Sequence, residues 1–165
     1  MTAESTFAIR PATPLDVTHI MAMIRELAVF EKLEHQVVAT DALLHEGLFG
    51  AKPSCEAIIG EADGEVVSYA LFFHNFSTFL TKKGLYLEDL YVRQVHRGKG
   101  YGTRMLTRLA QIAVERNCGR FEWSVLDWNE PAIQFYKAMG ADILPDWRIC
   151  RLTGDTLDAL AERRA

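Results

Sequence analysis

Hydrophobic positions along this chain switch between a spacing typical of helices and a spacing typical of strands. The segment Thr13-Pro14-Leu15-Asp16 predicts a helix start, because Thr can cap a helix, Pro fits the first turn, and Asp favours the positive end of the helix dipole. The helix that follows has one apolar face, formed by Val17, Ile20, Ile24, Leu27 and Ala28. A second apolar face, formed by Met105, Leu109, Ile112 and Ala113, predicts a long helix over Tyr101–Arg116.

Runs rich in β-branched and aromatic residues predict strands between and after these helices. The predicted strands are Phe7–Arg10, Glu56–Glu61, Glu65–Phe76, Leu85–Val92 and Arg120–Val125, with Ala141–Leu144 and Trp147–Leu152 as the last strands. The second and third are joined at Ala62-Asp63-Gly64, which is typical of a hairpin turn. Shorter helices are predicted after a Thr40 cap, through Leu44 to an end near Gly47 or Gly50, over Asn129–Met139 with Gly140 as its end, and over Gly154–Arg163. This order predicts an α+β fold, with a mixed sheet and helices on both faces.

Composition narrows the class of protein. The 165 residues, of which 24% are charged and 49% hydrophobic, predict one soluble domain over residues 1–165. No apolar run approaches the roughly 20 residues that cross a bilayer, and Met1-Thr2-Ala3-Glu4-Ser5 lacks the pattern of a signal peptide. An odd number of cysteines without a CxxC pair, namely Cys55, Cys118 and Cys150, indicates a reducing, cytoplasmic location. The 5 histidines lack metal-ligand spacing, so we expect no metal site, and the lack of a long apolar run predicts no membrane partner.

The glycine-rich stretch Arg97-Gly98-Lys99-Gly100-Tyr101-Gly102 lies between the predicted strand Leu85–Val92 and the predicted helix Tyr101–Arg116. A turn at a helix start leaves backbone N–H groups without helical partners, and the helix dipole adds partial positive charge there. Such a turn favours the binding of a phosphate or pyrophosphate.

The local charge agrees with an anion site. No acidic residue lies between Asp89 and Glu115, although the net charge of the whole chain is −4. The basic residues in this interval are Arg93, Arg97, Lys99, Arg104 and Arg108. A solvated helix face is the alternative, but glycine in a first helical turn lowers stability and therefore indicates another use. We expect no nucleic-acid partner, because the basic run is short and lacks interleaved aromatic residues.

The spacing of the glycines decides which of the known phosphate-binding motifs the loop fits. The dinucleotide pattern G-x-G-x-x-G and the Walker loop both fail at Thr103. The pattern R-x-x-G-x-G fits at Arg97, Gly100 and Gly102. This pattern resembles the acetyl-CoA loop of the GCN5-related N-acetyltransferase (GNAT) superfamily, which implies acetyl-CoA as the co-substrate.

Acetyl transfer from a thioester to an amine needs a group that deprotonates the amine, because an ammonium with a pKa of ~10.4 has no free lone pair. Glu88 and Asp89 are candidates within an otherwise apolar predicted strand. Adjacent strand residues face opposite sides, so we expect one carboxylate in a cleft and the other in a packed or hydrogen-bonded setting, and not a working pair. A salt bridge or an edge-strand charge is the alternative, since a buried unpaired carboxylate is costly.

The second candidate for proton transfer is Tyr136, which follows Asn129 by two helical turns and so shares its helix face. A phenol near the sulfur can give a proton to the departing thiolate. An aromatic at this spacing is also typical of a core, and Asn129 is also an ordinary helix cap.

Further motifs resemble the spermidine/spermine (diamine) acetyltransferase family of the GNAT superfamily, from about Ile9 to Leu152. They are Ile9-Arg10-Pro11-Ala12-Thr13, Tyr86-Leu87-Glu88-Asp89, Trp128-Asn129-Glu130-Pro131-Ala132 and Phe135-Tyr136-Lys137. The resemblance implies a GNAT fold with a central, mostly antiparallel sheet, and a homodimer with the active site near its interface.

The same resemblance implies roles for individual residues. Glu88 would act through water as general base, and Tyr136 as general acid. The cofactor would be bound by Leu90, Tyr91, Val92, Arg97, Gly98, Lys99, Gly100, Tyr101, Gly102, Asn129 and Tyr136. The amine would be bound by Phe30, Glu31, Glu88 and Asp89.

The predicted reaction is direct attack by the primary amine of a small diamine or polyamine in a ternary complex. Phe30-Glu31-Lys32-Leu33 and Val125-Leu126-Asp127-Trp128, however, are similar to a sister branch that acetylates thialysine and related amino acids, whereas Asn129-Glu130-Pro131 is similar to the polyamine branch. The sequence therefore leaves the amine open. Two further alternatives are an acyl-cysteine enzyme using Cys118 or Cys150, and a non-catalytic regulator that binds acetyl-CoA.

Overall fold

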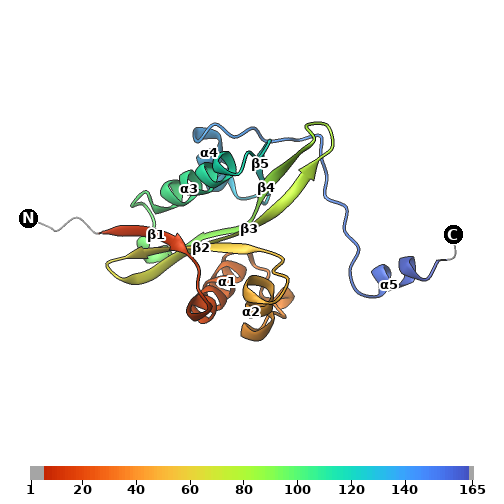
Figure 1. The fold of residues 1–165 in the computed structure, drawn as a ribbon, viewed down its shortest axis with the longest axis horizontal. Helices are drawn as coiled ribbons and strands as arrows, with labels where there is room; N and C mark the ends of the chain where they lie inside the picture. Colours follow the sequence, from red (N-terminus) through yellow and green to blue (C-terminus); the bar gives the residue numbers. More distant parts are fainter. Residues whose placement is uncertain (1–5, 164–165) are drawn as a thin grey trace, which may run out of the picture. The chain divides into compact units, whose positions relative to one another are not determined.

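A five-stranded sheet forms the centre of the first part of the chain in a computed structural model that describes residues 6–163 (Figure 1). The strands are β1 (Phe7–Pro11), β2 (Glu56–Ala62), β3 (Glu65–Ser77), β4 (Lys82–Val92) and β5 (Phe121–Trp123), and they lie in this order across the sheet. Neighbours are antiparallel from β1 to β4, and β5 is parallel to β4. The predicted mixed, mostly antiparallel sheet is therefore confirmed.

Helices cover both faces of this sheet (Figure 1). Helices α1 (Val17–Glu31) and α2 (Asp41–Phe49) lie on one face and α3 (Tyr101–Glu115) lies on the other. The start signals work as predicted. The Asp16 carboxylate accepts hydrogen bonds from the backbone N–H and the hydroxyl of Thr13, at 2.7 and 2.9 Å, and the Thr40 hydroxyl accepts one from the Leu43 N–H at 3.3 Å.

Two apolar layers hold the helices to the sheet. The layer under α1 and α2 consists of Ile20, Met23, Leu48, Ala57, Ile59, Val66, Tyr69, Leu71 and Tyr91. On the other face, the predicted apolar side of α3, with Met105, Leu109, Ile112 and Ala113, is buried. Because β3 and β4 are covered on both sides, they form a rigid support for the side chains discussed below.

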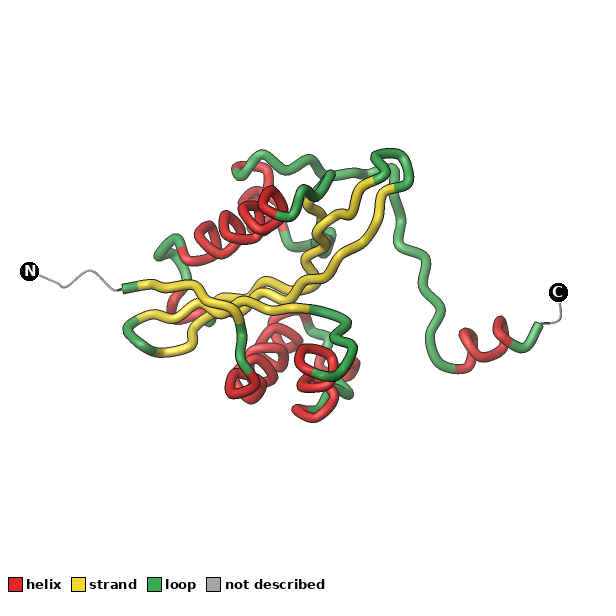
Figure 2. Tube along the Cα trace, viewed as in Figure 1, coloured by secondary structure: helices red, strands yellow, loops and turns green. Residues whose placement is uncertain are grey.

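The chain forms two compact units, and the second begins at Val125. The described part of this second unit contains α4 (Glu130–Ala138) and α5 (Asp155–Ala161), joined by an extended segment without regular structure (Figure 2). Asn129 caps α4 as predicted, and Gly140 follows its end with a φ of 91°.

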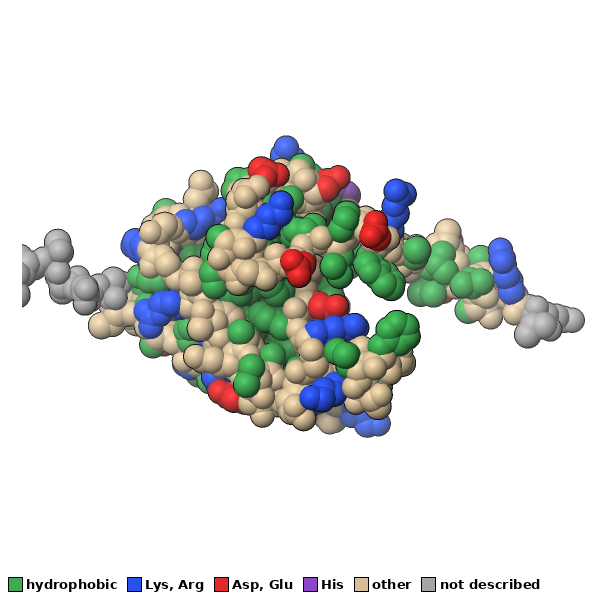
Figure 3. Space-filling model, turned by 90° about the horizontal axis from the view of Figure 1, so that it is seen from above, with side chains coloured by type: hydrophobic (Ala, Val, Ile, Leu, Met, Phe, Trp, Pro, Cys, Tyr) green, Lys and Arg blue, Asp and Glu red, His purple; other side chains and the backbone are tan. Residues whose placement is uncertain are grey.

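The prediction of final strands at Ala141–Leu144 and Trp147–Leu152 is wrong for the chain as the structure describes it, because neither segment pairs with a strand. A strand needs a neighbour that satisfies its backbone N–H and C=O groups, and an apolar pattern alone supplies none. Hydrophobic side chains of this unit lie at the surface instead (Figure 3), with Trp147 80% and Ile149 71% exposed. No helix among residues 6–163 is long and apolar enough to span a membrane.

Candidate active site

The glycine-rich loop leads from β4 into α3 and keeps its backbone open. Gly98 and Gly100 have φ values of 76° and 78°, in the region that favours glycine. A Cβ added to either would meet no protein atom within 4 Å. The first helical hydrogen bond of α3 runs from the Arg104 N–H to the Gly100 carbonyl, so the N–H groups of residues 101–103 precede the helical ladder. This geometry fits a bound diphosphate, as the sequence predicts.

Most arginines of the basic segment are engaged elsewhere. Arg104 donates to the Phe7 carbonyl at 2.7 Å, Arg108 pairs with Glu115 at 2.8 Å, and Arg93 lies 3.4 Å from Glu26 and 3.5 Å from Glu65. The contacts of Arg104 and Arg93 tie the start of α3 and the residue after β4 to other elements, whereas the Arg108–Glu115 pair lies within α3. At the predicted anion site, the groups left for a ligand are thus the loop backbone and Lys99, an exposed cation without an ion-pair partner among the described residues.

Arg97 takes a different position from its neighbours. Its Nε donates to the Val92 carbonyl at 3.0 Å, and its guanidinium lies over the rings of Phe30 and Tyr91, at 4.9 and 5.4 Å from their centres. Phe30 is close to the end of α1. Arg97 therefore connects the glycine loop with a residue predicted to bind the amine.

Strand β4 lacks a neighbour on one side over its second half. β5 pairs with it only from Leu85 to Leu87, opposite Phe121 to Trp123. In the described residues no strand continues this ladder along Leu90, Tyr91 and Val92. Apart from the Val92 carbonyl, which accepts a hydrogen bond from Arg97 Nε, the backbone groups of these residues on that side can meet a ligand with peptide-like groups, such as pantetheine.

A β-bulge places the two adjacent carboxylates. Asp89 lies opposite Leu71 and Leu87 lies opposite Phe72, so Glu88 is the extra residue of the bulge. The prediction that Glu88 and Asp89 face opposite sides assumes a regular strand, whose alternation the bulge breaks, so it stays a prediction. Burial, with a contribution from the charge of Glu88, raises the pKa of Asp89, and burial, Glu56 and Glu88 raise the pKa of Cys55, which packs against the core under α1. Asp89, opposite Leu71 of the core under α1, faces this helix, and Glu88 lies near enough for its charge to act on Asp89.

The environments of the two carboxylates nevertheless differ. Glu88 is exposed, whereas Asp89 is partly buried and accepts a hydrogen bond from the Tyr69 hydroxyl at 3.0 Å. Burial, with a contribution from Glu88, raises the pKa of Asp89, while the bond from Tyr69 opposes the rise. The expectation that one carboxylate lies in a packed, hydrogen-bonded setting agrees with this arrangement.

Glu31, the last residue of α1, belongs to the same acidic group. Burial and the charge of Asp89 both raise the pKa of Glu31. The C-terminal end of a helix also disfavours a negative charge. No Lys or Arg among the described residues forms an ion pair with Glu31, Glu88 or Asp89. The first unit therefore concentrates negative charge beside the unpaired part of β4, where it can bind a cation.

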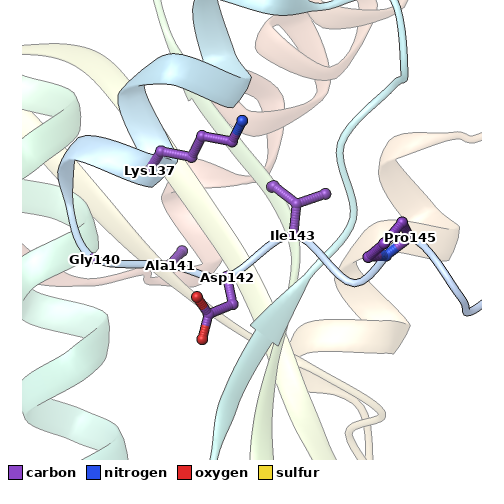
Figure 4. A pocket seen from close by; sticks show the side chains of 6 residues that line it. All are labelled: Lys137, Gly140, Ala141, Asp142, Ile143 and Pro145. Carbon is purple, nitrogen blue, oxygen red and sulfur yellow. The ribbon is translucent and has the colours of Figure 1, made fainter.

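The second unit carries the other predicted site residues. The Asn129 side chain accepts a hydrogen bond from the Ala132 N–H at 3.3 Å, so it caps α4. Tyr136 lies on α4, with its ring 5.3 Å from that of Phe135. An open hollow of about 520 Å³ follows this helix (Figure 4) and is lined by Lys137, Gly140, Ala141, Asp142, Ile143 and Pro145. Lys137 and Asp142 point away from each other there, and the hollow contains none of the predicted site residues.

Sequence reasoning missed two polar contacts of interest. Nothing in the sequence around Tyr69, which lies in an apolar strand, indicates a functional role apart from its own hydroxyl. Its hydrogen bond to Asp89 depends on the bulge. Cys118 has a histidine neighbour that the sequence does not reveal, since its sulfur lies 3.9 Å from His74 Nδ1. That nitrogen is also 2.9 Å from the Gly84 carbonyl. Cys118 follows the far end of α3, whose 15 residues span roughly 22 Å, so it lies away from the glycine loop.

Comparison with known proteins decides the family. The model of the acetyltransferase (GNAT) family matches residues 21–141. The chain belongs to the GNAT family. This acetyltransferase is 40% identical to the thialysine N-epsilon-acetyltransferase of Mus musculus, over 94% of the chain and 97% of the relative. It is 36% identical to the L-ornithine N5-acetyltransferase NATA1 of Arabidopsis thaliana, over 92% of the chain and 86% of the relative.

The solved structures agree on the fold of this acetyltransferase. An integron cassette protein from the mobile metagenome of V. cholerae matches it with a TM-score of 0.80 and 25% identity, over 95% of the chain and 98% of that structure. GNAT acetyltransferases use acetyl-CoA and an acceptor such as an amine. When bound, acetyl-CoA supplies the activated thioester, and the loop backbone and the open side of β4 are the groups of this chain that fit it.

Proposed function

We propose that this acetyltransferase acetylates a primary amine of a small diamine or polyamine by direct attack in a ternary complex. The observation that carries the proposal is the group of three carboxylates, Glu31, Glu88 and Asp89, beside the open half of β4, without an ion-pair cation among the described residues. A diamine brings two positive charges. One nitrogen is the nucleophile, and the other remains an ammonium that the carboxylates bind.

The roles of the carboxylates follow from their exposure. Glu88 is exposed and can reach a water molecule, so we assign it the general base that removes a proton from the attacking ammonium through that water. Asp89, partly buried and held by Tyr69, together with Glu31 and Phe30, binds the distal part of the amine. The separation of a solvated base from a fixed cation binder favours a substrate with two distinct charged ends.

On the cofactor side, the proposal assigns binding to backbone groups. Residues 97–102 bind the diphosphate of acetyl-CoA, and Leu90, Tyr91 and Val92 receive pantetheine along the unpaired side of β4. Asn129 contacts the cofactor, and Tyr136 gives a proton to the departing thiolate. Both units together then form one acetyltransferase domain.

A second candidate substrate is a basic amino acid such as thialysine or ornithine. It is favoured by the two relatives described above, a thialysine and an L-ornithine acetyltransferase at 40% and 36% identity. Such a substrate would present an α-carboxylate as well as an α-ammonium. The carboxylate needs a cation or backbone donors, whereas the first unit offers an acidic group at the amine end.

A matched pair of substrates separates these candidates. Thialysine and its decarboxylated analogue, S-(2-aminoethyl)cysteamine, differ only in the carboxylate, and lysine and cadaverine form a second pair. We expect the diamine of each pair to have the higher kcat/KM in a CoA-release assay, with putrescine, spermidine, spermine and ornithine measured alongside. A preference of more than tenfold for the amino acids would assign the enzyme to the thialysine candidate. CoA binding without turnover of any amine would instead favour a regulator.

We also propose that two copies associate through the second unit. Its extended segment forms no strand and carries exposed hydrophobic side chains, among them Trp147, Ile149 and Leu152. Exposed apolar patches of this kind mark interaction surfaces, and an extended segment can add a strand to a second copy. Sedimentation equilibrium should give a dimer, and the Trp147→Ser, Ile149→Ser double variant should give a monomer. The free thiols of Cys55, Cys118 and Cys150 support a cytoplasmic location.

A further inference from the structure

A buried phenol on β3 holds one carboxylate of the acidic group. Tyr69 is fully buried, and its hydroxyl donates a hydrogen bond to Asp89 Oδ2 at 3.0 Å. Tyr69 lies directly opposite Tyr91, and Asp89 precedes Tyr91 by two residues, so its side chain is the diagonal neighbour of Tyr69 on the same face. The bulge at Glu88 brings Asp89 into this register.

Packing alone does not account for a tyrosine at this position. Phenylalanine would fill the same apolar volume among Ile59, Leu71 and Tyr91. A buried hydroxyl is unfavourable unless it has a hydrogen-bond partner, and here the partner is a carboxylate that faces the predicted amine site. The hydroxyl is therefore explained by its action on Asp89.

The charges around Asp89 explain what that action does. Glu31 faces it from α1 and Glu88 from β4, and both are acidic, while β3 contributes Tyr69. Burial and Glu88 favour the neutral form of Asp89, and the phenol favours the ionised form. Burial also raises the pKa of Tyr69 well above its usual value, so the phenol stays protonated and remains a donor.

We propose that Tyr69 is a positioning residue of the amine site, whose phenol orients the Asp89 carboxylate and keeps it charged for the ammonium of the substrate. The role of Asp89 as amine binder rests on the proposed function. The hydrogen bond between Tyr69 and Asp89 does not.

Steady-state kinetics of Tyr69→Phe between pH 6 and 9 provide the first test. Loss of a hydrogen bond to a charged group predicts about a tenfold rise in the KM for the amine near pH 6.5. The rise should shrink toward pH 9, because the Asp89 carboxyl, with its pKa raised further, is ionised there in both proteins. The kcat and the Kd for CoA should change less than about twofold. Tyr86→Phe is the matched control, since it removes a hydroxyl that bonds Ser124 at 2.8 Å on the same sheet.

Titration of the Asp89 carboxyl carbon by NMR, assigned with Asp89→Asn, provides a second test that needs no turnover. Its midpoint should move to higher pH in Tyr69→Phe and stay in place in Tyr86→Phe. Introduction of 3-fluorotyrosine at position 69, a stronger hydrogen-bond donor, should move it to lower pH.

Three outcomes would overturn the proposal. They are an unmoved midpoint in Tyr69→Phe, a loss of kcat and amine affinity that is equal at all pH values, and a fluorotyrosine shift in the wrong direction. If the wild-type protein turns over no amine, the proposed function fails, and the NMR midpoint still decides whether Tyr69 controls Asp89.

Discussion

The guanidinium of Arg97 lies 4.9 Å from the centre of the Phe30 ring, and this contact joins the glycine loop to the end of α1. The same group lies 5.4 Å from the ring of Tyr91, and its Nε bonds the Val92 carbonyl. One side chain thus touches residues assigned to the cofactor site and a residue assigned to the amine site. Binding at either site can therefore affect the other through Arg97.

Arg97→Ala tests this connection. A cation–π contact at an exposed site contributes about 0.5–1 kcal/mol, so we expect the KM for the amine to rise about two- to fivefold, together with a rise in the KM for acetyl-CoA. Phe30→Ala should raise the KM for the amine, and the double variant should show less than the product of the single effects. Arg108→Ala, which breaks a contact to Glu115 on the surface of α3, is the control. Independent effects of the two substitutions would contradict the connection.

Gly100→Ala tests the diphosphate site, with Gly64→Ala as its control. Both glycines have positive φ, 78° and 84°, and both face open space, but Gly64 lies in the hairpin between β2 and β3. Each substitution should lower the free energy of unfolding by about 1 kcal/mol, because alanine is strained in this conformation. Only Gly100→Ala should raise the Kd for CoA in calorimetry, by more than about tenfold, since its methyl group occupies the open space in which we place the diphosphate. Equal Kd values for the two variants would place the cofactor elsewhere.

The bounds of the elements followed from local sequence, because caps, turn residues and periodic apolar positions are local properties. Thr13, Thr40, Gly64 and Gly140 all lie at the boundaries that their chemistry predicts. The bulge at Glu88 was not predictable in this way. It depends on the register between β3 and β4, and no residue in Leu85–Val92 marks it.

The final strands were predicted wrongly for a related reason. The pattern in Trp147–Leu152 is apolar enough for a strand, but a strand also needs a partner, and the described chain supplies none. The contacts of the basic segment were likewise not predictable from local sequence. Its net charge was visible in the sequence, whereas the engagement of Arg93 and Arg104 depends on Glu26 and Phe7, which lie far along the chain.

Glu88→Gln tests the general base. We expect kcat to fall about a hundredfold and the acid limb of the pH–rate profile to disappear, because the amide accepts no proton from water. Acetyl-CoA affinity should not change. Glu46→Gln, on the exposed surface of α2, is the control. An unaltered profile in Glu88→Gln would assign the base to another group.

Tyr136→Phe tests the general acid. Turnover should fall about a hundredfold while the Kd for acetyl-CoA stays within about twofold, because the phenol acts on the departing thiolate and not on the bound thioester. An acetyl donor with a more acidic thiol needs less protonation and should restore part of the rate. If the defect is the same with both donors, Tyr136 has a role in packing on α4 and not in proton transfer.

Asp16→Asn tests how β1 is joined to the start of α1. Arg10 binds both oxygens of Asp16 at 2.7 and 2.8 Å and lowers the pKa of this carboxyl to about 2. Because the folded pKa is lower than the unfolded one, the pair stabilises the fold above about pH 4, and this stabilisation is lost as the pH falls toward 2. The substitution should lower the free energy of unfolding by roughly 2 kcal/mol at pH 7 and flatten its pH dependence between 4 and 2. Urea denaturation over this range provides the measurement, with the exposed Asp158→Asn as control. If the variant has the same free energy of unfolding at pH 7 as the wild type, the Arg10–Asp16 ion pair does not stabilise the fold beyond what the bonds between Arg10 and Glu61 contribute.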